Sequence, residues 1–340
     1  MRLIRFLTLL PPLAALALAG TGCGEVKIEK REEAAPDPKQ SFSAALEKHL
    51  EDTRLLTESG INRRASFSSD GRSIVWLRQA DAAGEFRIYS MKADGGDPHL
   101  VPTGVGRCYD PAFSPDGKAI LYAAAASGGD PVPAAAAGPG LRLFNPALDL
   151  FRCGLDGQAP QRLTDRPGFD GEGSYSWGGA KIVFTSFRDG SGDLWLMNAD
   201  GTGQERLVRL AAYAGGARVS PDGSQVVFHA AGADGRTVEI YLADLPGCVP
   251  RRLTSLGATS FAPVWHPSQK FIVFTSNAAE HDYELFAVRP DGSGLERVTY
   301  SLGFDGFAEF SRAGDRIVWT TQRGSSEGGH TNIATAHWAR

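Results

Sequence analysis

The sequence lacks the residue arrangements on which several classes of enzyme depend. None of its seven histidines stands in a His-x-x-x-His spacing, so the helical zinc site of many metalloproteases is excluded. No glycine-rich segment follows a predicted strand and opens a helix, so the phosphate loop of nucleotide-binding enzymes is missing as well. We therefore predict a chain that has no metal ion, no cofactor and no catalytic activity.

The chain also has no excess of positive charge and few cysteines. Its formal net charge is −4, and nucleic acid binding needs a clustered basic surface, so nucleic acid is not an expected partner. The four cysteines are Cys23, Cys108, Cys153 and Cys248. If Cys23 has the separate role described next, an odd number remains, and at least one thiol is then free in an exported chain.

The N-terminal 22 residues have the order of a secretion signal. Two arginines precede an apolar stretch over 6–19 that is too short to span a bilayer comfortably. The next four residues, Gly-Thr-Gly-Cys, resemble the lipobox of bacterial lipoproteins, in which the cysteine becomes the first residue and carries lipid. A glycine stands where that motif usually has leucine. We predict a signal peptide over 1–22 and lipid attachment at Cys23; cleavage that leaves Cys23 unmodified is the alternative.

Two short segments separate this signal from the body of the chain. Residues 23–40 are charged, contain proline and have little to bury, which predicts a flexible tether. Apolar residues at helix-like spacing then follow a serine that can cap a helix, which predicts a short helix over 41–52.

From residue 53 onward the chain repeats itself six times. Each repeat has an apolar residue, a turn of the Pro-Asp-Gly type, and three apolar residues in a row. Short runs of β-branched and aromatic residues between turn residues predict strands covered on both faces. The repeats begin at Phe67, Phe113, Tyr175, Val219, Trp265 and Phe310, and the third apolar residue is always aromatic: Trp76, Tyr122, Phe184, Phe228, Phe274 and Trp319.

Two further elements complete each repeat. One leads into an Asp-Gly turn, and the next ends in Leu-Thr or a related pair, so each repeat holds about four short strands, the make-up of a propeller blade. The last repeat lacks its fourth strand, whereas a fourth-strand signature, Leu-Leu-Thr at 55–57, precedes the first repeat. We therefore predict an all-β, six-bladed β-propeller over 53–340 that is closed by an N-terminal strand pairing into the C-terminal blade.

The repeat resembles the WD40-like repeat of TolB-type propellers. The likeness rests on Ser-Pro-Asp-Gly-Lys at 114–118 and on Ser-Phe-Arg-Asp-Gly at 186–190, followed by Asp-Leu-Trp-Leu-Met-Asn-Ala-Asp-Gly at 193–201. It covers 53–340 and implies a propeller fold and a place in the bacterial cell envelope. TolB-type proteins also carry an α/β domain before the propeller, where this chain has only the tether and the short helix.

The two faces of the predicted propeller carry different loops. Turns such as those at 115–117 and 200–201 open on one face, whereas the loops between second and third strands and the crossings between blades open on the other. The second face includes an insertion over 125–148, which is either an unstructured loop or a docking arm. Binding usually resides in variable loops on a rigid scaffold, so this loop-rich face is the candidate binding face.

Aromatic-aspartate pairs occur in three of the blade crossings on this face. Three aspartates near a central channel would suit a cation or a basic peptide group; the alternative is that each carboxylate accepts backbone N–H groups in a turn. The segment over 189–193 has aspartates at both ends but lacks the glutamate that would complete a calcium loop. The candidate binding residues are Tyr109, Asp110, Phe169, Asp170, Arg188, Asp189, Asp193, Phe304 and Asp305.

Together these features favour binding over catalysis. We predict a non-catalytic binding or scaffold propeller of the bacterial cell envelope, a monomer that engages a protein or envelope partner through its loop-rich face or channel mouth. A lipid anchor would hold it on the periplasmic or cell-surface side of a membrane. The alternative is a hydrolase or lyase that acts on carbohydrate or peptide with carboxylates of the same face.

The lipid anchor has a direct test. Cys23→Ser should move the protein from the membrane fraction to the soluble fraction, because the thiol is the proposed lipid attachment point. Cys248→Ser is the matched control and should leave the distribution unchanged. A Cys23→Ser protein that stays with membranes would place the anchor elsewhere.

Overall fold

The computed structural model describes residues 46–79, 84–125, 147–210, 212–232, 235–279, 282–325 and 329–339. The chain divides into residues 1–37 and 38–340, and every described residue belongs to the second unit. The signal peptide, the tether, Cys23 and almost all of the 125–148 insertion therefore lie outside the described residues. Within the described ranges, no helix has the length and apolar character needed to cross a bilayer.

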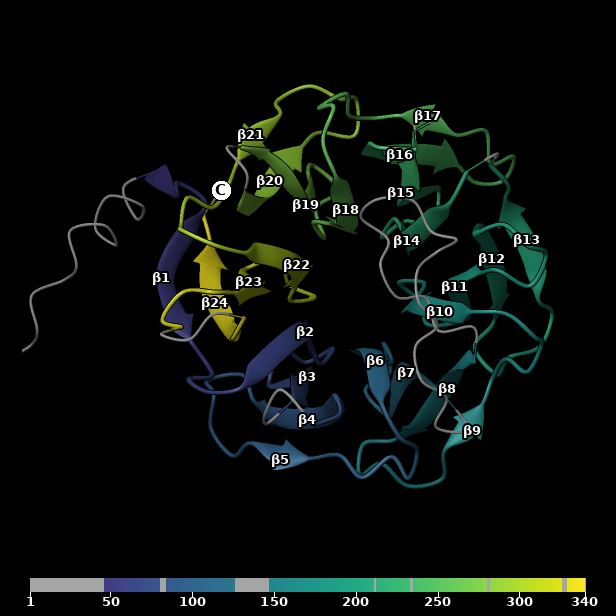
Figure 1. The fold of residues 1–340 in the computed structure, drawn as a ribbon, viewed down its shortest axis with the longest axis horizontal. Coiled ribbons are helices and arrows are strands. Elements are labelled where there is room, and N and C mark those ends of the chain that lie inside the picture. The colour runs from purple at the N-terminus through teal and green to yellow at the C-terminus, as the bar shows by residue number, and fades with distance from the viewer. Residues whose placement is uncertain are drawn as a thin grey trace, which may run out of the picture. The chain divides into compact units, whose positions relative to one another are not determined.

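The described residues form six four-stranded antiparallel sheets that radiate from a central channel (Figure 1). Blade one holds β2 (Ile61–Phe67), β3 (Ser73–Gln79), β4 (Arg87–Lys92) and β5 (His99–Leu100). Blade two holds β6 (Cys108–Phe113), β7 (Ala119–Ala125), β8 (Leu148–Gly154) and β9 (Gln161–Arg162). Blade three holds β10 (Asp170–Tyr175), β11 (Lys181–Ser186), β12 (Asp193–Asn198) and β13 (Glu205–Val208).

The other three blades follow the same plan. Blade four holds β14 (Ala214–Val219), β15 (Gln225–Ala231), β16 (Val238–Asp244) and β17 (Arg251–Arg252). Blade five holds β18 (Ser260–Trp265), β19 (Ile272–Ala279), β20 (Asp282–Val288) and β21 (Glu296–Arg297). Blade six holds β22 (Asp305–Phe310), β23 (Arg316–Thr321) and β24 (Asn332–Trp338), with β1 (Leu50–Leu55) as its outer strand. The predicted six-bladed, all-β fold is confirmed.

The position of the second strand in each blade explains why three consecutive residues of that strand are apolar. Each run lies in the middle of its sheet, where adjacent blades cover both faces. The third, aromatic residue of every run is at most 1% exposed. Burying side chains of this size contributes about 2 kcal/mol each, so the six aromatic residues are a large part of what holds the blades together.

The Ser-Pro-Asp-Gly turns are stabilised by their own side chains. The Ser114 hydroxyl donates to Asp116 Oδ1 at 2.6 Å, and the same carboxylate accepts from the Lys118 N–H at 3.1 Å. Gly117 has a φ of 70°, which glycine adopts without strain. The motif therefore specifies a turn between the first and second strands.

The Leu-Thr pairs that end the repeats also have a structural role. The threonine hydroxyl accepts a main-chain N–H from the third strand of its own blade. This contact joins Leu150 N to Thr164 Oγ1 at 2.9 Å and Leu285 N to Thr299 Oγ1 at 2.8 Å. Each threonine therefore fastens the short outer strand to the blade.

The ring closes through pairing between the two ends of the propeller. Strand β1 lies antiparallel to β24, with Leu50 opposite Trp338 and Leu55 opposite Ala334 (Figure 1). The closing strand begins earlier than predicted, at Leu50, and the predicted 55–57 segment ends the pairing: the Leu56 N–H donates to the Ile333 carbonyl at 2.7 Å, and the Thr57 hydroxyl accepts the Ile333 N–H at 2.9 Å. Of the predicted helix over 41–52, residues 41–45 lie outside the described residues; among the others only Leu46 is helical, and residues 50–52 already form the strand.

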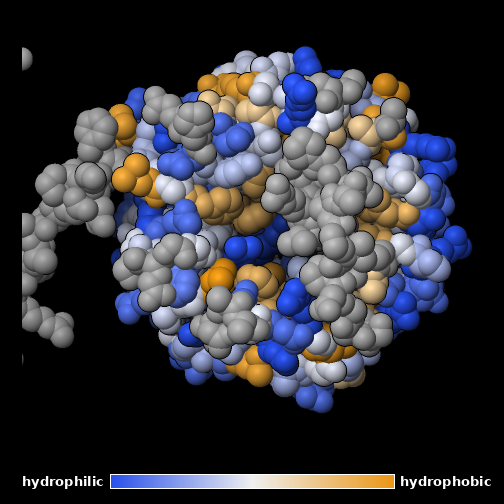
Figure 2. Space-filling model, viewed as in Figure 1, coloured by the Kyte–Doolittle hydropathy of each residue, from blue (hydrophilic) through white to orange (hydrophobic). Residues whose placement is uncertain are grey.

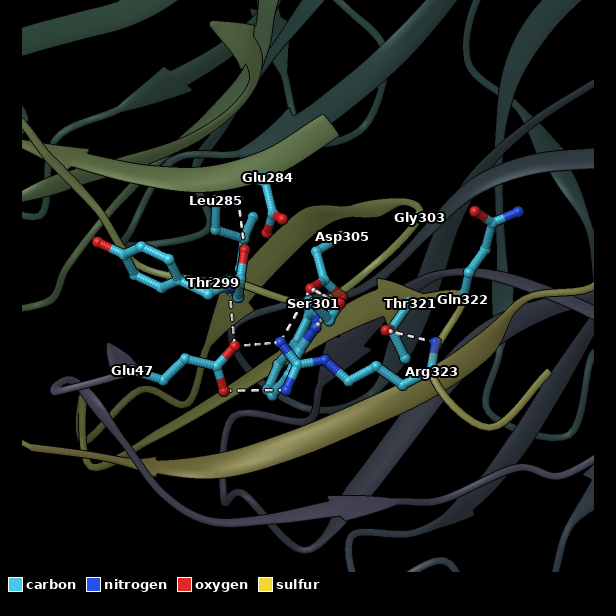
Figure 3. A network of polar contacts seen from close by, with 12 residues as sticks. Glu47, Glu284, Leu285, Thr299, Ser301, Gly303, Asp305, Thr321, Gln322 and Arg323 are labelled. Carbon is cyan, nitrogen blue, oxygen red and sulfur yellow. Dashed lines mark hydrogen bonds and ion pairs between the residues drawn. The ribbon is translucent and has the colours of Figure 1, made fainter. Parts of the chain in front are cut away.

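A buried ion network fastens the segment before β1 to blade six (Figure 3). Arg323 Nη1 donates to Glu47 Oε2 at 2.9 Å, and Nη2 donates to Asp305 Oδ2 at 2.9 Å. Glu47, only 3% exposed, also accepts the Tyr300 N–H at 2.8 Å. Burial alone would lower the pKa of Arg323, but the two carboxylates raise it, so this guanidinium stays charged.

Removal of Glu47 should weaken the fold. We expect Glu47→Ala to lower the free energy of unfolding by roughly 3 kcal/mol, because it leaves buried charge and a backbone N–H without their partner. Denaturant unfolding followed by tryptophan fluorescence measures this. Glu51→Ala, at an exposed position of β1, is the control and should change stability by less than about 0.5 kcal/mol. Equal effects of the two substitutions would show that the network is not needed.

Candidate ligand site in the central channel

A β-bulge occurs at the same place in the innermost strand of every blade. The strand register shifts there in all six sheets, and the bulged residue has a positive φ between 49° and 60°. A bulge redirects a side chain out of its regular position, here on the strands that surround the channel. The bulged residues are Arg64, Asp110, Glu172, Gly216, Ala262 and Phe307, each three positions before the start of its repeat.

Neighbouring blades hold these bulges in place. The Gly216 N–H donates to Glu172 Oε2 at 2.9 Å, and the Phe307 N–H donates to Thr275 Oγ1 at 3.0 Å. The Arg64 N–H likewise donates to Thr320 Oγ1 at 3.0 Å. Because each contact joins adjacent blades, the bulges are rigid parts of the ring.

A cavity of about 390 Å³ lies at the channel mouth on the loop-rich face, and we call it the cup. Figure 2 views this face and shows hydrophilic surface at the bottom of a central hollow, with hydrophobic surface beside it. The charged lining residues are Arg63, Arg64, Arg107, Asp110, Glu172 and Arg218. The larger apolar lining residues are Leu77, Phe86, Leu148, Phe169, Val238, Phe261 and Phe307.

Ion pairs form the floor of the cup. Arg64 Nη1 lies 2.8 Å from Asp110 Oδ1, and its guanidinium lies 4.0 Å above the Phe307 ring. Arg218 of blade four reaches across the channel to Glu309 of blade six, with 3.0 Å between Nη2 and Oε1. Burial raises the pKa of Asp110, while the nearby Arg64 opposes that rise. The floor is therefore a charged layer built from four different blades.

The channel is crossed again near its opposite mouth. Arg312 of blade six donates to the Trp177 carbonyl of blade three at 3.2 Å, and its guanidinium lies 4.5 Å from the Trp177 ring. These two blades face one another across the ring (Figure 1). Side chains thus cross the channel at two levels, which narrows the channel below the cup.

One wall of the cup contains a hydrogen-bonded Glu172–Tyr213–His229 cluster. Tyr213 Oη donates to Glu172 Oε2 at 2.9 Å and lies 3.3 Å from His229 Nε2. Burial raises the pKa of Glu172, but attraction to His229 and Arg64 and hydrogen bonds from Thr185 and Tyr213 outweigh it, so the net shift is downward. Burial lowers the pKa of His229 to about 4. At neutral pH the cluster holds a charged carboxylate and a neutral imidazole.

Three of the nine predicted binding residues line the cup: Tyr109, Asp110 and Phe169. Asp170 and Arg188 instead form a fully buried ion pair at 2.8 Å within blade three. Asp305 is buried in the network of Figure 3 and accepts the Trp319 indole N–H at 2.9 Å.

The other three lie apart from the cup's lining. Asp189 is exposed and pairs with Arg206 at 3.0 Å, and Asp193 is buried and accepts the Ser191 hydroxyl at 3.2 Å. Phe304 packs against Tyr283 and the cup residue Phe307, with ring centroids 5.8 and 5.5 Å apart.

The repeat period explains this outcome. Asp110 is a bulged residue, but Asp170 and Asp305 stand two residues before the bulges of their own strands. Aligning the blades on their aromatic-aspartate pairs therefore matches Asp110 with residues that lie two positions before the corresponding bulges. Alignment by the start of each repeat would have found Arg64 and Glu172, which the sequence prediction missed.

The remaining predicted features concern metals and thiols. Among the described residues, no group of three or more histidine, cysteine, aspartate or glutamate side chains is placed to hold a metal ion. Cys108, Cys153 and Cys248 are free thiols, the first two buried in blade two.

Comparison with known sequences gives partial matches. No family model matches the chain. An uncharacterized protein of Agrobacterium fabrum is 28% identical over 193 residues, which cover 54% of this chain and 59% of the relative. A TolB homolog of Chlorobium luteolum is 29% identical over 149 residues, which cover 43% of this chain and 32% of the relative. The chain thus spans only about a third to three-fifths of these relatives.

Solved structures share the fold more completely. A protein assigned as TolB from Agrobacterium tumefaciens superposes with a TM-score of 0.61 at 18% identity, covering 84% of this chain and 94% of that one. TolB from Acinetobacter baumannii gives 0.58 at 19% identity, covering 72% and 56%. Oligogalacturonate lyase from Vibrio parahaemolyticus gives 0.52 at 13% identity, covering 84% and 93%.

Fold and ring geometry define the protein as a closed six-bladed β-propeller with a partly charged cup on its axis. The sequence matches to TolB homologs refine that class. In sequence and in fold, the chain is similar to TolB-type propellers.

The buried imidazole should make the fold sensitive to acid. Because the folded-state pKa of His229 lies near 4 and its ordinary value is 6.5, the unfolded chain binds the additional proton first as the pH falls. Stability is therefore lost below about pH 6.5, by about 2 kcal/mol at pH 5.

His229→Gln removes this titration. Its unfolding free energy should fall less than that of the wild type between about pH 7.5 and pH 5, as measured by denaturant unfolding. His99→Gln, an exposed position in β5, is the control and should follow the wild type. Parallel curves for the wild type and His229→Gln would contradict the assigned neutral state.

Proposed function

We propose that this TolB-like propeller is a non-catalytic binding module of the bacterial envelope that engages a protein partner through the cup. The observation that carries the proposal is the cup itself, a cavity of about 390 Å³ with apolar walls and a charged floor. Such a combination suits a ligand that buries apolar side chains and is oriented by a few polar contacts.

The rigidity of the site supports binding. The cup is built on strands whose bulges are hydrogen-bonded to neighbouring blades, and its floor residues are held by ion pairs. A preformed site loses little conformational entropy when a partner segment enters it.

The same proposal includes export of the protein and its attachment to a membrane. The signal order of residues 1–22 and the lipobox-like cysteine favour export and a lipid anchor at Cys23, with the tether at 23–40 leading to the propeller. The relatives named TolB homolog favour an envelope protein. We propose a monomer whose cup faces a protein or other envelope component.

The second candidate is a lyase or hydrolase that uses the carboxylates of the cup. It is favoured by Asp110, whose pKa is raised by burial, and by the shared fold with oligogalacturonate lyase. The segment 324–328 reads Gly-Ser-Ser-Glu-Gly, but it connects two strands, β23 and β24, whereas the serine nucleophile elbow connects a strand to a helix. Residues 326–328 lie outside the described residues.

Site-specific photocrosslinking in the native host tests the binding function. A photoreactive phenylalanine analogue in place of Phe261, on the wall of the cup, should give a discrete protein adduct. The same analogue at Leu100, which is 43% exposed on β5, is the control and should not give that adduct.

The opposite outcome has a defined meaning. No adduct at Phe261, together with turnover of oligogalacturonate by the purified protein that Glu172→Gln abolishes, would replace the binding function with the enzymatic one. Adducts of equal yield at both positions would show that the cup is not the docking site.

A further inference from the structure

We propose that the partner segment bound by the cup carries a carboxylate next to an apolar side chain, and that Arg63 and Arg107 bind the carboxylate. This inference rests on the proposed function and adds to it the chemistry of the partner. It is carried by the charge balance of the cup and by the arrangement of its charged and apolar walls.

Cationic groups outnumber anionic groups in the described lining of the cup. Four arginines face two carboxylates, those of Asp110 and Glu172. Arg64 is paired with Asp110, and Arg218 is paired with Glu309 below the cup. Glu172 is occupied by the Thr185 and Tyr213 hydroxyls and the Gly216 N–H.

Two of the four arginines in the lining, Arg63 and Arg107, have no carboxylate partner within the described residues. Throughout the part of the chain that the structure describes, neither Arg63 nor Arg107 has an ion-pair partner or a side-chain hydrogen bond. The pKa of Arg63 is lowered by burial and by repulsion from the neighbouring Arg64. Arg63 is exposed at the mouth of the cup and Arg107 is half-buried, so both are within reach of a ligand, and a bound anion would relieve the repulsion between Arg63 and Arg64.

Both arginines lie on the same side of the cup. The Arg63 guanidinium of blade one lies 5.3 Å from the Phe86 ring. The Phe86 carbonyl accepts the Cys108 N–H at 3.0 Å, so the main chain of Arg107 lies next to Phe86, and both arginines line the cup. Guanidinium groups bind carboxylates with paired, charge-assisted hydrogen bonds, which makes this side of the cup a carboxylate site.

The bulged residues differ in charge between the two sides of the ring, although apolar residues also line blades one and two and Arg218 belongs to blade four. In blades one to three the bulged residues are Arg64, Asp110 and Glu172, which are all charged. In blades four to six they are Gly216, Ala262 and Phe307, which carry no charge, and Phe261 and Val238 extend this side. A ligand that fits both sides is amphipathic, with its anionic group toward blades one and two and its apolar group toward blades five and six.

A carboxylate beside an apolar side chain has two sources in a protein, an Asp or Glu within the chain and the C-terminus. Four small probes separate them: N-acetyl-Gly-Phe with a free carboxylate, the same compound as its amide, N-acetyl-Phe-Glu-Gly amide, and 3-phenylpropanoate. Binding to the full-length protein in detergent is measured by ligand-observed NMR, which detects weak affinities.

At least one carboxylate probe should bind about tenfold more tightly than the uncharged amide, because a charge-assisted pair contributes on the order of 1.4 kcal/mol or more. Arg63→Gln and Arg107→Gln should each lower that affinity about tenfold and leave amide binding unchanged. Arg252→Gln, on the outer strand β17, is the matched control and should change neither. Unchanged melting temperatures show that the variants are folded.

The outcomes distinguish the carboxylate inference from the proposed function. Equal binding of the amide and the carboxylates, or no effect of either arginine variant, overturns the inference. If the photoreactive residue at Phe261 still captures a partner in that case, the binding function stands without it. Arginine-dependent binding of galacturonate but of no peptide probe would overturn the inference in favour of a sugar acid. Preference between the C-terminal and glutamate probes identifies the source of the carboxylate.

Discussion

The structure depends on the main-chain pairing of β1 with β24, which joins the two ends of the propeller into one blade. Six blades around an axis share a channel only if the ring is closed, and an unpaired β24 would leave an open sheet edge. The Glu47–Arg323–Asp305 network reinforces that pairing by tying the preceding segment to blade six. The positions of all six innermost strands, and therefore the cup, follow from closure.

The cup shows how a repeated scaffold yields a site without symmetry. The same bulge recurs in every blade and presents one residue at the channel, but the residue type changes from blade to blade. The bulged residues are charged in three successive blades and uncharged in the other three, so the ring presents different chemistry on its two sides. Ion pairs between blades, such as Arg218 with Glu309, then form the floor of the cup. Specificity thus resides in single positions of a rigid ring.

Much of the fold could be predicted because its signals are local. The Ser114–Asp116 turn and the buried aromatic residues such as Trp76 depend on neighbours in the same repeat, so the repeat period specifies blade number and strand order. The site was harder to predict. Asp170 and Asp305 resemble Asp110 in their aromatic neighbour, but a bulge separates them by two positions in register. Their carboxylates consequently meet Arg188 and Arg323 inside the blades rather than a ligand.

By itself, the sequence determined the six repeats, their turns, the apolar middle strands and the existence of a strand that completes the last blade, because each is written in short-range patterns. Tertiary structure alone decided which residues meet on the axis. Arg64, Asp110, Arg218 and Glu309 are separated by tens to hundreds of positions, and only ring closure and the bulges bring their charges together. Such contacts depend on long-range geometry that no local pattern encodes, which is why the cup and its charge balance became visible only in the folded chain.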